Sequence, residues 1–352
     1  MKNLNKTNLT ALKIIAMIMI LTIALVGCAG DDSAGSVETD PNETNQTETN
    51  QTETGQTGSE DITPINVAVL NGPTGIGAIK LMDNPVYDVS VYQSPAEMIG
   101  RIVTGEVDVA AVPANLAATL YNRTEGDVVS LGPIALGVLF IVQNVDDESE
   151  IISSISDLAG RTILAGGRGS TTEHILNNLL KSVGLDIETD VNMEWFLNHS
   201  EVNATLVTRP GAIAMIPEPF VSIAQNHSED VKMVLDLNEA WRSATGGELT
   251  MSVLVAQRSF VEENPNRLET LLADVKNSIY FVNNSPDAPA LIAEKGFIPD
   301  VGIAARAIPG CNLVFFEDRQ QGNSLLRAFL EILYEIDAES IGGRLPDENF
   351  FN

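Results

Sequence analysis

One residue pattern occurs twice in this chain, and it limits the possible folds more than any other feature. Residues 101–117 and 205–221 each predict the end of a helix, a tight turn, an apolar strand that ends in proline, and the start of another helix. The copies lie roughly a hundred residues apart, which is too long a period for a stacked solenoid. Alternating strands and helices favour a mainly parallel sheet with helices on both faces. We therefore expect two similar α/β lobes.

Further elements repeat in the same order. The apolar or alternating runs 65–70, 87–92 and 161–165 predict strands, and the first and third are each followed by a glycine-rich loop. Ser94, Pro95 and Glu97 have the spacing of a capping box, which predicts a helix start. Residues 137–143 and 251–257 are two similar strands that each end in glutamine. They lie where the chain would pass from one lobe to the other and back.

The first 27 residues read as a targeting signal. Three lysines precede the apolar run Ile14–Val26, which is short for a membrane span but typical of a signal peptide. The run leads into Leu25-Val26-Gly27-Cys28, which resembles a bacterial lipobox. We expect Cys28 to become the lipidated first residue of an extracytoplasmic protein that its acyl chains hold on the cell membrane. An uncleaved N-terminal anchor with a chance cysteine is the alternative.

Residues 28–61 are predicted to form a disordered tether behind the lipid. From 31 to 61 the chain has nine acidic residues and no basic one, and Val37 is its only large apolar residue. Such a segment cannot bury enough apolar surface to offset the entropy lost on ordering.

Charge and cysteine content narrow the possible partners. With 20 Lys+Arg against 48 Asp+Glu, the formal charge is −28, which argues against binding to nucleic acid and to anionic lipid surfaces. Two cysteines exclude a disulfide framework and a Cys-rich zinc site, and three histidines argue against a His-based metal site. No cofactor or metal is expected. If Cys28 carries lipid, Cys311 is a free thiol, and we expect it to be buried.

At this point a family resemblance becomes specific. The lipobox is followed in order by five further stretches that match: 72–77, 105–113, 216–219, 264–273 and 280–293. No single stretch is diagnostic, but their order is, and the resemblance extends over about 62–352. The chain resembles extracytoplasmic substrate-binding lipoproteins of ABC importers, in the nitrate/sulfonate/taurine and thiamine-precursor class. The resemblance implies the type II periplasmic-binding-protein fold, with two α/β lobes joined by two crossing strands. By this analogy lobe one comprises 62–140 plus 255–352, and lobe two comprises 141–254.

The resemblance also implies partners and a mode of binding. A small solute is enclosed between the lobes by hinge closure, and a permease and an ATPase subunit receive it. Proteins of this kind are usually monomers. In open parallel sheets ligands bind outside the carboxyl ends of the strands, which places four loops of this chain in the cleft.

Loops one and two belong to lobe one. Loop one supplies the candidate ligand residues Asn71, Gly72, Pro73, Thr74 and Gly75, because its glycines let backbone N–H groups approach a ligand near a helix N-terminus. A purely structural tight turn is the alternative. Loop two supplies Pro113 and Asn115, whose amide both donates and accepts hydrogen bonds. A helix cap alone is the alternative role for Asn115.

Loop three supplies the candidates Arg168, Gly169, Ser170 and Thr171, of which Ser170 or Thr171 is expected to cap the following helix. The Arg168 guanidinium suits a carboxylate, sulfonate or phosphate group. A solvated arginine, or one paired with surface acids, is the alternative.

Loop four holds Glu218 between two prolines. This carboxylate accepts N–H groups of the ligand, pairs with Arg168, or caps the helix at Phe220. Three weaker candidates are Ser94, Trp241, which stacks on a flat ligand or packs in the core, and Thr250.

Three functions from different classes compete. Capture of a small polar or anionic organic molecule for import is the leading hypothesis, and a zwitterion would reconcile Arg168 with Glu218. A sensor or adhesion lipoprotein without a transporter is the second, and a neighbouring permease and ATPase would distinguish import from sensing. An enzyme on the same fold is the third, although no Ser-His-Asp or Cys-His constellation stands out. We therefore predict no catalytic residues.

Overall fold

The computed structural model describes residues 63–145 and 147–351 of the chain. The predicted signal peptide, Cys28 and the predicted tether lie outside the described residues. Among the described helices, none combines the length and the apolar content needed to cross a bilayer.

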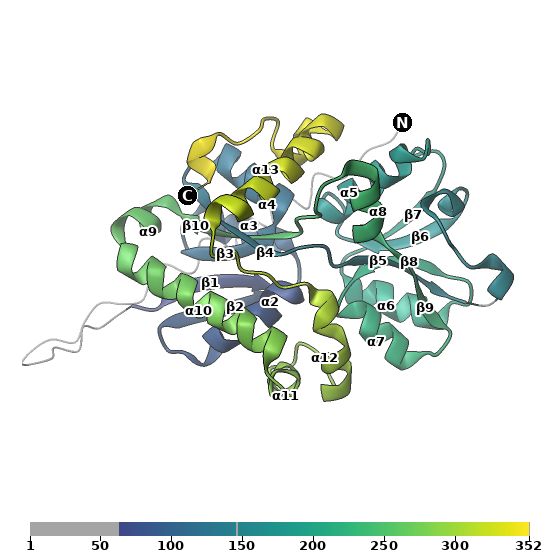
Figure 1. The fold of residues 1–352 in the computed structure, drawn as a ribbon, viewed down its shortest axis with the longest axis horizontal. Coiled ribbons are helices and arrows are strands. Elements are labelled where there is room, and N and C mark those ends of the chain that lie inside the picture. Colours follow the sequence, from purple (N-terminus) through teal and green to yellow (C-terminus); the bar gives the residue numbers. More distant parts are fainter. Residues whose placement is uncertain (1–62, 146, 352) are drawn as a thin grey trace, which may run out of the picture. The chain divides into compact units, whose positions relative to one another are not determined.

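The described strands form two five-stranded sheets (Figure 1). The first sheet has the order β2-β1-β3-β10-β4, and the second has the order β7-β6-β8-β5-β9. The strand bounds are β1 (Ile65–Leu70), β2 (Tyr87–Tyr92), β3 (Val109–Pro113), β4 (Val128–Ala135), β5 (Leu139–Asn144), β6 (Thr162–Gly166), β7 (Asn192–Phe196), β8 (Ile213–Pro217), β9 (Val231–Asp236) and β10 (Ser252–Gln257).

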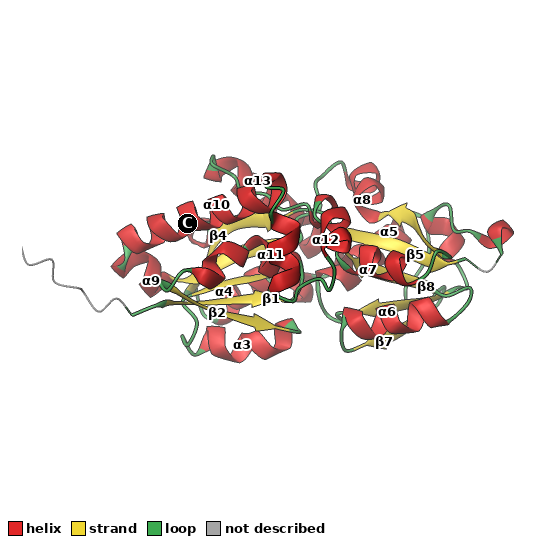
Figure 2. Cartoon of the chain, turned by 90° about the horizontal axis from the view of Figure 1, so that it is seen from below, coloured by secondary structure: helices red, strands yellow, loops and turns green. Residues whose placement is uncertain are grey.

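Helices lie on both sides of the sheets (Figure 2), which confirms the predicted α/β class. Their bounds are α2 (Pro73–Gly77), α3 (Pro95–Val103), α4 (Ala114–Arg123), α5 (Thr171–Ser182), α6 (His199–Thr208), α7 (Phe220–His227), α8 (Leu237–Thr245), α9 (Arg258–Glu263), α10 (Pro265–Asn284), α11 (Ala288–Glu294), α12 (Val301–Ala307) and α13 (Arg319–Ile336). Short 3₁₀ helices include η2 (Ile79–Asp83), η5 (Pro309–Cys311) and η6 (Ala338–Ile341).

The two sheets have the same pairing pattern. In the first, β1 pairs in parallel with β2 and β3, whereas β10 is antiparallel to β3 and β4. In the second, β6 pairs in parallel with β7 and β8, whereas β5 is antiparallel to β8 and β9. Each sheet is therefore mixed. The strand that runs against the others is in both cases one that the chain enters from the opposite sheet, β10 after α8 and β5 after β4.

The duplicated sequence pattern corresponds to β3 with α4 and to β8 with α7. Both strands are buried along most of their length, with burial from Val109 to Val112 and from Ile213 to Pro217. Buried strands in parallel pairings are typically near-continuous apolar runs, which explains why the two sequence copies look alike.

The hydrophobic core continues from one sheet to the other. One cluster of buried side chains includes Val253 of the first sheet and Ile163 of the second. It also includes Trp241 of α8, which packs against Phe329 of α13 with ring centroids 5.4 Å apart. Cys311 is a free and fully buried thiol, as predicted, and burial raises its pKa.

The capping box predicted at Ser94 does not form. Ser94 occupies the N-cap position of α3, but its Oγ donates to the Glu97 carboxylate at 2.8 Å. The other carboxylate oxygen accepts from the Gln93 backbone N–H at 3.4 Å. An ionised carboxylate is a stronger acceptor than a neutral group, so the hydroxyl turns toward it and away from the helix backbone.

Candidate functional site

The carboxyl ends of strands from both sheets surround one cavity of about 130 Å³, which we call the central cavity. From the first sheet and its loops it is lined by Leu70, Asn71, Gly72, Pro73, Thr74, Gln93, Pro95, Pro113, Met251 and Ser252. Val138 lies on the segment that crosses from β4 to β5. From the second sheet it is lined by Gly167, Ser170, Thr171, Thr172, His199, Pro217 and Phe220.

Six helices begin at this cavity. Pro73, Pro95, Thr171, His199 and Phe220 are the first residues of α2, α3, α5, α6 and α7, and Pro113 directly precedes α4. The first turn of a helix leaves backbone N–H groups without partners and carries a partial positive charge. The central cavity is therefore suited to a ligand group that is negatively charged or rich in hydrogen-bond acceptors.

Loop one is held in place by its own hydrogen bonds. The Thr74 hydroxyl accepts from the Leu70 N–H at 3.0 Å and donates to the Leu70 carbonyl at 3.1 Å. These two bonds close the turn from Leu70 to Thr74. Gly72 has φ 150° and ψ −151°, a conformation that favours glycine. Gly75 faces away from the cavity lining, because a Cβ there would come within 2.3 Å of the Phe297 ring.

The Asn115 side chain hydrogen-bonds to two segments that are distant from it in the sequence. Its side-chain oxygen accepts from the Thr171 hydroxyl at 2.8 Å, and its Nδ2 donates to the Ser340 carbonyl at 3.2 Å. Asn115 is buried, but it does not line the central cavity. Its amide connects α4 to α5 and to η6, and neither of its two predicted roles, ligand contact or helix cap, describes these contacts.

His199 lines the central cavity at the start of α6, with its ring 5.4 Å from that of Phe220. Its Nδ1 is buried and has no hydrogen-bond partner among the described residues. Burial lowers the pKa of His199 to about 4, so the imidazole is neutral at pH 7. His199 is one of the three histidines that argue against a His-based metal site, and no other role was predicted for it. The repeat could have identified it, because the β7–α6 loop of the second sheet corresponds to the β2–α3 loop of the first.

Arg168 lies outside the central cavity. It is exposed and lines a separate groove of about 340 Å³ together with Glu173, Glu188 and Trp195. Gly169 also does not line the cavity, and its N–H donates to the Glu173 carboxylate. Ser170 occupies the N-cap position of α5 but makes no capping bond, and its Oγ instead donates to the Gly167 carbonyl at 2.5 Å and lies 2.7 Å from the Thr172 hydroxyl.

Glu218 is buried and caps α7. Its carboxylate accepts from the Ser222 N–H at 3.1 Å and from the Ser222 hydroxyl at 2.9 Å. Burial raises the pKa of Glu218, and the two hydrogen bonds partly offset that effect. Of the roles predicted for this residue, the structure shows the helix cap.

The predicted site residues thus fall into two groups. The central cavity is lined by Asn71, Gly72, Pro73, Thr74, Pro113, Ser170 and Thr171. It is not lined by Gly75, Ser94, Asn115, Arg168, Gly169, Glu218, Trp241 and Thr250. Trp241 and Thr250 are fully buried. The sequence reading missed Leu70, Gln93, Pro95, Val138, Gly167, Thr172, His199, Pro217, Phe220, Met251 and Ser252.

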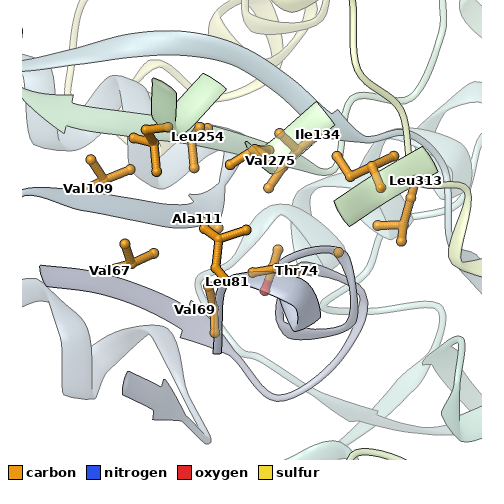
Figure 3. A pocket seen from close by; sticks show the side chains of 14 residues that line it. Val67, Val69, Thr74, Leu81, Val109, Ala111, Ile134, Leu254, Val275 and Leu313 are labelled. Carbon is orange, nitrogen blue, oxygen red and sulfur yellow. The ribbon is translucent and has the colours of Figure 1, made fainter. Parts of the chain in front are cut away.

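A second void, of about 10 Å³, lies between the first sheet and α10. Figure 3 shows its apolar lining, with Val67 and Val69 of β1, Val275 of α10 and Leu313 pointing into it. This volume is at the lower limit for a single water, and the lining offers little polarity, so the void is a feature of core packing. In the described part of the chain, no group of three or more His, Cys, Asp or Glu side chains could hold a metal ion.

Comparison with known proteins agrees with this geometry. The family model of the periplasmic substrate-binding protein of phosphonate ABC transporters matches residues 85–299. No curated protein sequence matches the chain.

Several solved structures share the fold. An ABC transporter protein from Parabacteroides distasonis is similar with TM-score 0.67 and 22% identity, over 82% of this chain and 98% of that chain. The periplasmic aliphatic sulphonate binding protein SsuA from Escherichia coli is similar with TM-score 0.63 and 16% identity, over 81% and 92%. The periplasmic nitrate-binding protein NrtA from Synechocystis PCC 6803 is similar with TM-score 0.54 and 11% identity, over 69% of each chain.

These structures confirm the predicted type II periplasmic-binding-protein fold. The family match covers more than half of the chain and includes strands of both sheets and most of the loops that line the central cavity. The chain belongs to the family of periplasmic substrate-binding proteins of phosphonate ABC transporters.

Proposed function

We propose that this protein captures a compact oxyanion in the central cavity and delivers it to the permease and ATPase of an ABC importer. One observation carries the proposal: helix starts from both sheets meet at a single cavity. Phosphonate, sulfonate and nitrate, which appear in the names of the matching family and of two similar structures, are all oxyanions. Their oxygens suit the free N–H groups of helix first turns.

We propose that residues 62–140 plus 255–352 and residues 141–254 act as two lobes. A solute that touches Thr74 on one side and Thr171 on the other contacts both sheets. Such a solute stabilises the closed arrangement by its differential affinity for it. The crossing segments β4–β5 and α8–β10 are the natural hinge.

Hydrogen bonds to the solute would come from side chains on both sides of the cavity. The hydroxyls of Ser170, Thr172 and Ser252, the Asn71 amide and the His199 imidazole are all positioned on the wall. Arg168 would act near the entrance, from the groove beside loop three. Glu218 has a structural role as the cap of α7.

We propose binding without catalysis. The His199 Nδ1 has no partner among the described residues, so it does not activate a hydroxyl on the cavity wall. A general base for nucleophilic catalysis must lie within hydrogen-bond reach of its nucleophile.

The function is tested by measuring the melting temperature of the protein with methylphosphonate, methanesulfonate and nitrate. A ligand that binds the folded state raises the melting temperature by mass action, and calorimetry then gives the dissociation constant. Ser170→Ala should weaken binding of the stabilising oxyanion by about tenfold, as for one lost hydrogen bond to a charged group. Ser324→Ala, on the exposed face of α13, is the control and should bind normally. If no oxyanion raises the melting temperature, the proposal is wrong.

We also propose that Cys28 is lipidated and holds a monomeric protein at the outer face of the cell membrane. Cys28→Ser should release the protein into the soluble extracytoplasmic fraction, because the acyl chains supply the membrane affinity. Cell fractionation with an antibody measures the distribution. Unchanged membrane retention of the variant would exclude the lipid anchor.

A further inference from the structure

We propose that the central cavity selects against solutes that carry an ammonium group, and takes compact oxyanions with an apolar or no substituent. This specificity rests on the proposed function, because it concerns the same cavity. The protein would bind simple alkylsulfonates and alkylphosphonates more tightly than their amino analogues.

The composition of the cavity wall disfavours a cation. Among the 18 described residues that line the central cavity, none is Asp, Glu, Lys or Arg. His199 is the only titratable side chain there with a pKa in the acid-to-neutral range, and it is neutral at pH 7. An ammonium group that leaves water needs an opposite charge or several acceptors to replace its hydration. The wall provides no such charge.

Four carboxylates lie close in sequence to residues of the wall. Glu97, Glu173 and Glu201 lie in the first turns of α3, α5 and α6, and Glu218 lies two residues before the start of α7. None of these four residues lines the cavity.

Each of the four carboxylates is bonded within its own loop. Glu97 accepts from Gln93 N and Ser94 Oγ, and Glu173 accepts from Gly169 N. Glu201 accepts from Leu197 N at 3.2 Å. Glu218 accepts from Ser222 N and Oγ. These bonds hold the four carboxylates to their own loops, and none of the four side chains lines the cavity.

The electrostatic field of the helix starts and the apolar side chains of the wall both favour an alkyl oxyanion over a cation. The helix starts present partial positive charge to the cavity, which opposes a cation and favours an anion. Between them the walls are apolar, with side chains from both sheets and from the crossing segment: Leu70, Pro95, Val138, Pro217, Phe220 and Met251. An alkyl group fits such a surface without loss of hydrogen bonds.

The size of the central cavity limits the size of the solute. The volume of about 130 Å³ is small for a ligand site. Pockets for drug-sized ligands are several times larger. The central cavity therefore accommodates a compact solute, in which an ammonium group would lie close to the wall.

The test uses pairs of solutes in which a methyl group replaces an ammonium group of similar size. The pairs are propane-1-sulfonate with taurine, and ethylphosphonate with aminomethylphosphonate. Calorimetry on the full-length protein should show at least about tenfold tighter binding of the methyl member of a pair. Equal or tighter binding of the amino member would overturn the specificity and leave the proposed function intact. If none of the four binds, and methylphosphonate, methanesulfonate and nitrate also do not, the proposed function itself fails.

A charge variant tests the cause. Gln93 lies on the wall, and its Oε1 accepts from Asn71 Nδ2 at 3.2 Å, a bond that a carboxylate can also accept. Gln93→Glu should shift the affinity ratio by at least about threefold toward the amino member of each pair. Gln321→Glu makes the same charge change at an exposed position of α13 and should leave the ratio unchanged. If Gln93→Glu also leaves the ratio unchanged, the charge of the wall does not set the specificity.

Discussion

At the scale of single residues, the most informative side chain is His199. It lies on the wall of the central cavity at the start of α6, with a buried Nδ1 that has no partner among the described residues. Burial lowers its pKa to about 4 from an ordinary value of 6.5. A polar atom that is shielded from water and unpaired is costly, unless a ligand supplies the missing hydrogen bond.

This pKa shift predicts a loss of stability in acid. Between pH 6.5 and pH 4 the unfolded chain binds a proton at His199 that the folded protein does not, so the free energy of unfolding falls as the pH is lowered. Between pH 7 and pH 4.5, the free energy of unfolding of His199→Phe should fall by about 1–2 kcal/mol less than that of the unmodified protein. Thermal or urea unfolding at the two pH values measures it.

The matched control is His227→Gln. His227 is exposed at the end of α7, where its Nδ1 lies 2.7 Å from the Ile223 carbonyl, and the variant should keep the pH profile of the unmodified protein. Glu218, whose pKa is raised, works in the opposite direction because it loses stability as the pH rises. The comparison of variants cancels that contribution. If His199→Phe and the unmodified protein have the same pH profile, the imidazole is not buried in the neutral form.

At the scale of elements, the crossing from β4 to β5 is held from both sides. The Gly137 carbonyl accepts from Asn312 Nδ2 at 3.0 Å, and the Leu136 N–H donates to the Asn312 carbonyl at 3.1 Å. On the other side Asn238 of α8 lies so close that a Cβ on Gly137 would be 1.8 Å from its Oδ1. A side chain larger than hydrogen therefore does not fit at position 137, which precedes Val138 of the central cavity.

Gly137→Ala should lower the free energy of unfolding by at least about 2 kcal/mol, because the new methyl group overlaps the Asn238 side chain. Chemical denaturation measures the change, and calorimetry gives the accompanying loss of ligand affinity.

A double-mutant cycle isolates the cause. In the background of Asn238→Gly, which removes the overlapping side chain, Gly137→Ala should cost clearly less than it does alone. Equal costs in the two backgrounds would mean that the overlap with Asn238 is not the reason for the glycine.

At the scale of the whole molecule, net charge and ligand charge have the same sign. The chain carries a formal charge of −28, whereas the central cavity is suited to an anion. Long-range repulsion slows the approach of an anion, and salt screens exposed charges over about 10 Å at 0.1 M. The attraction at the helix starts acts over short distances within the cavity, where salt has less access.

We therefore expect the association rate constant for an alkylsulfonate to rise by about two- to fivefold between ~0.02 M and ~0.5 M sodium chloride. The dissociation rate should change less. Stopped-flow fluorescence would report binding through the two tryptophans, of which Trp241 belongs to the core cluster that includes residues of both sheets. An association rate that falls with added salt would show that a local positive field near the entrance, such as that of Arg168, outweighs the net charge.

The sequence by itself determined much of this protein. Near-continuous apolar runs, glycine-rich loops and the repeated helix–turn–strand pattern predicted the α/β class, most of the strands and four of the loops that supply residues to the cavity or lie beside it. These are local signals, because the period and burial of a segment of five to ten residues decide whether it forms a strand or a helix.

The tertiary structure decided which side chains of those loops face the cavity. Asn115 points to Thr171 and Ser340, partners 56 and 225 residues away along the chain. Glu218 folds back onto α7, and Arg168 faces an outer groove. His199 follows the edge strand β7 at the start of α6, and no local sequence pattern marked it as a cavity residue. The direction of a loop side chain depends on the groups that distant segments bring beside it, and spacing along one chain does not contain that information.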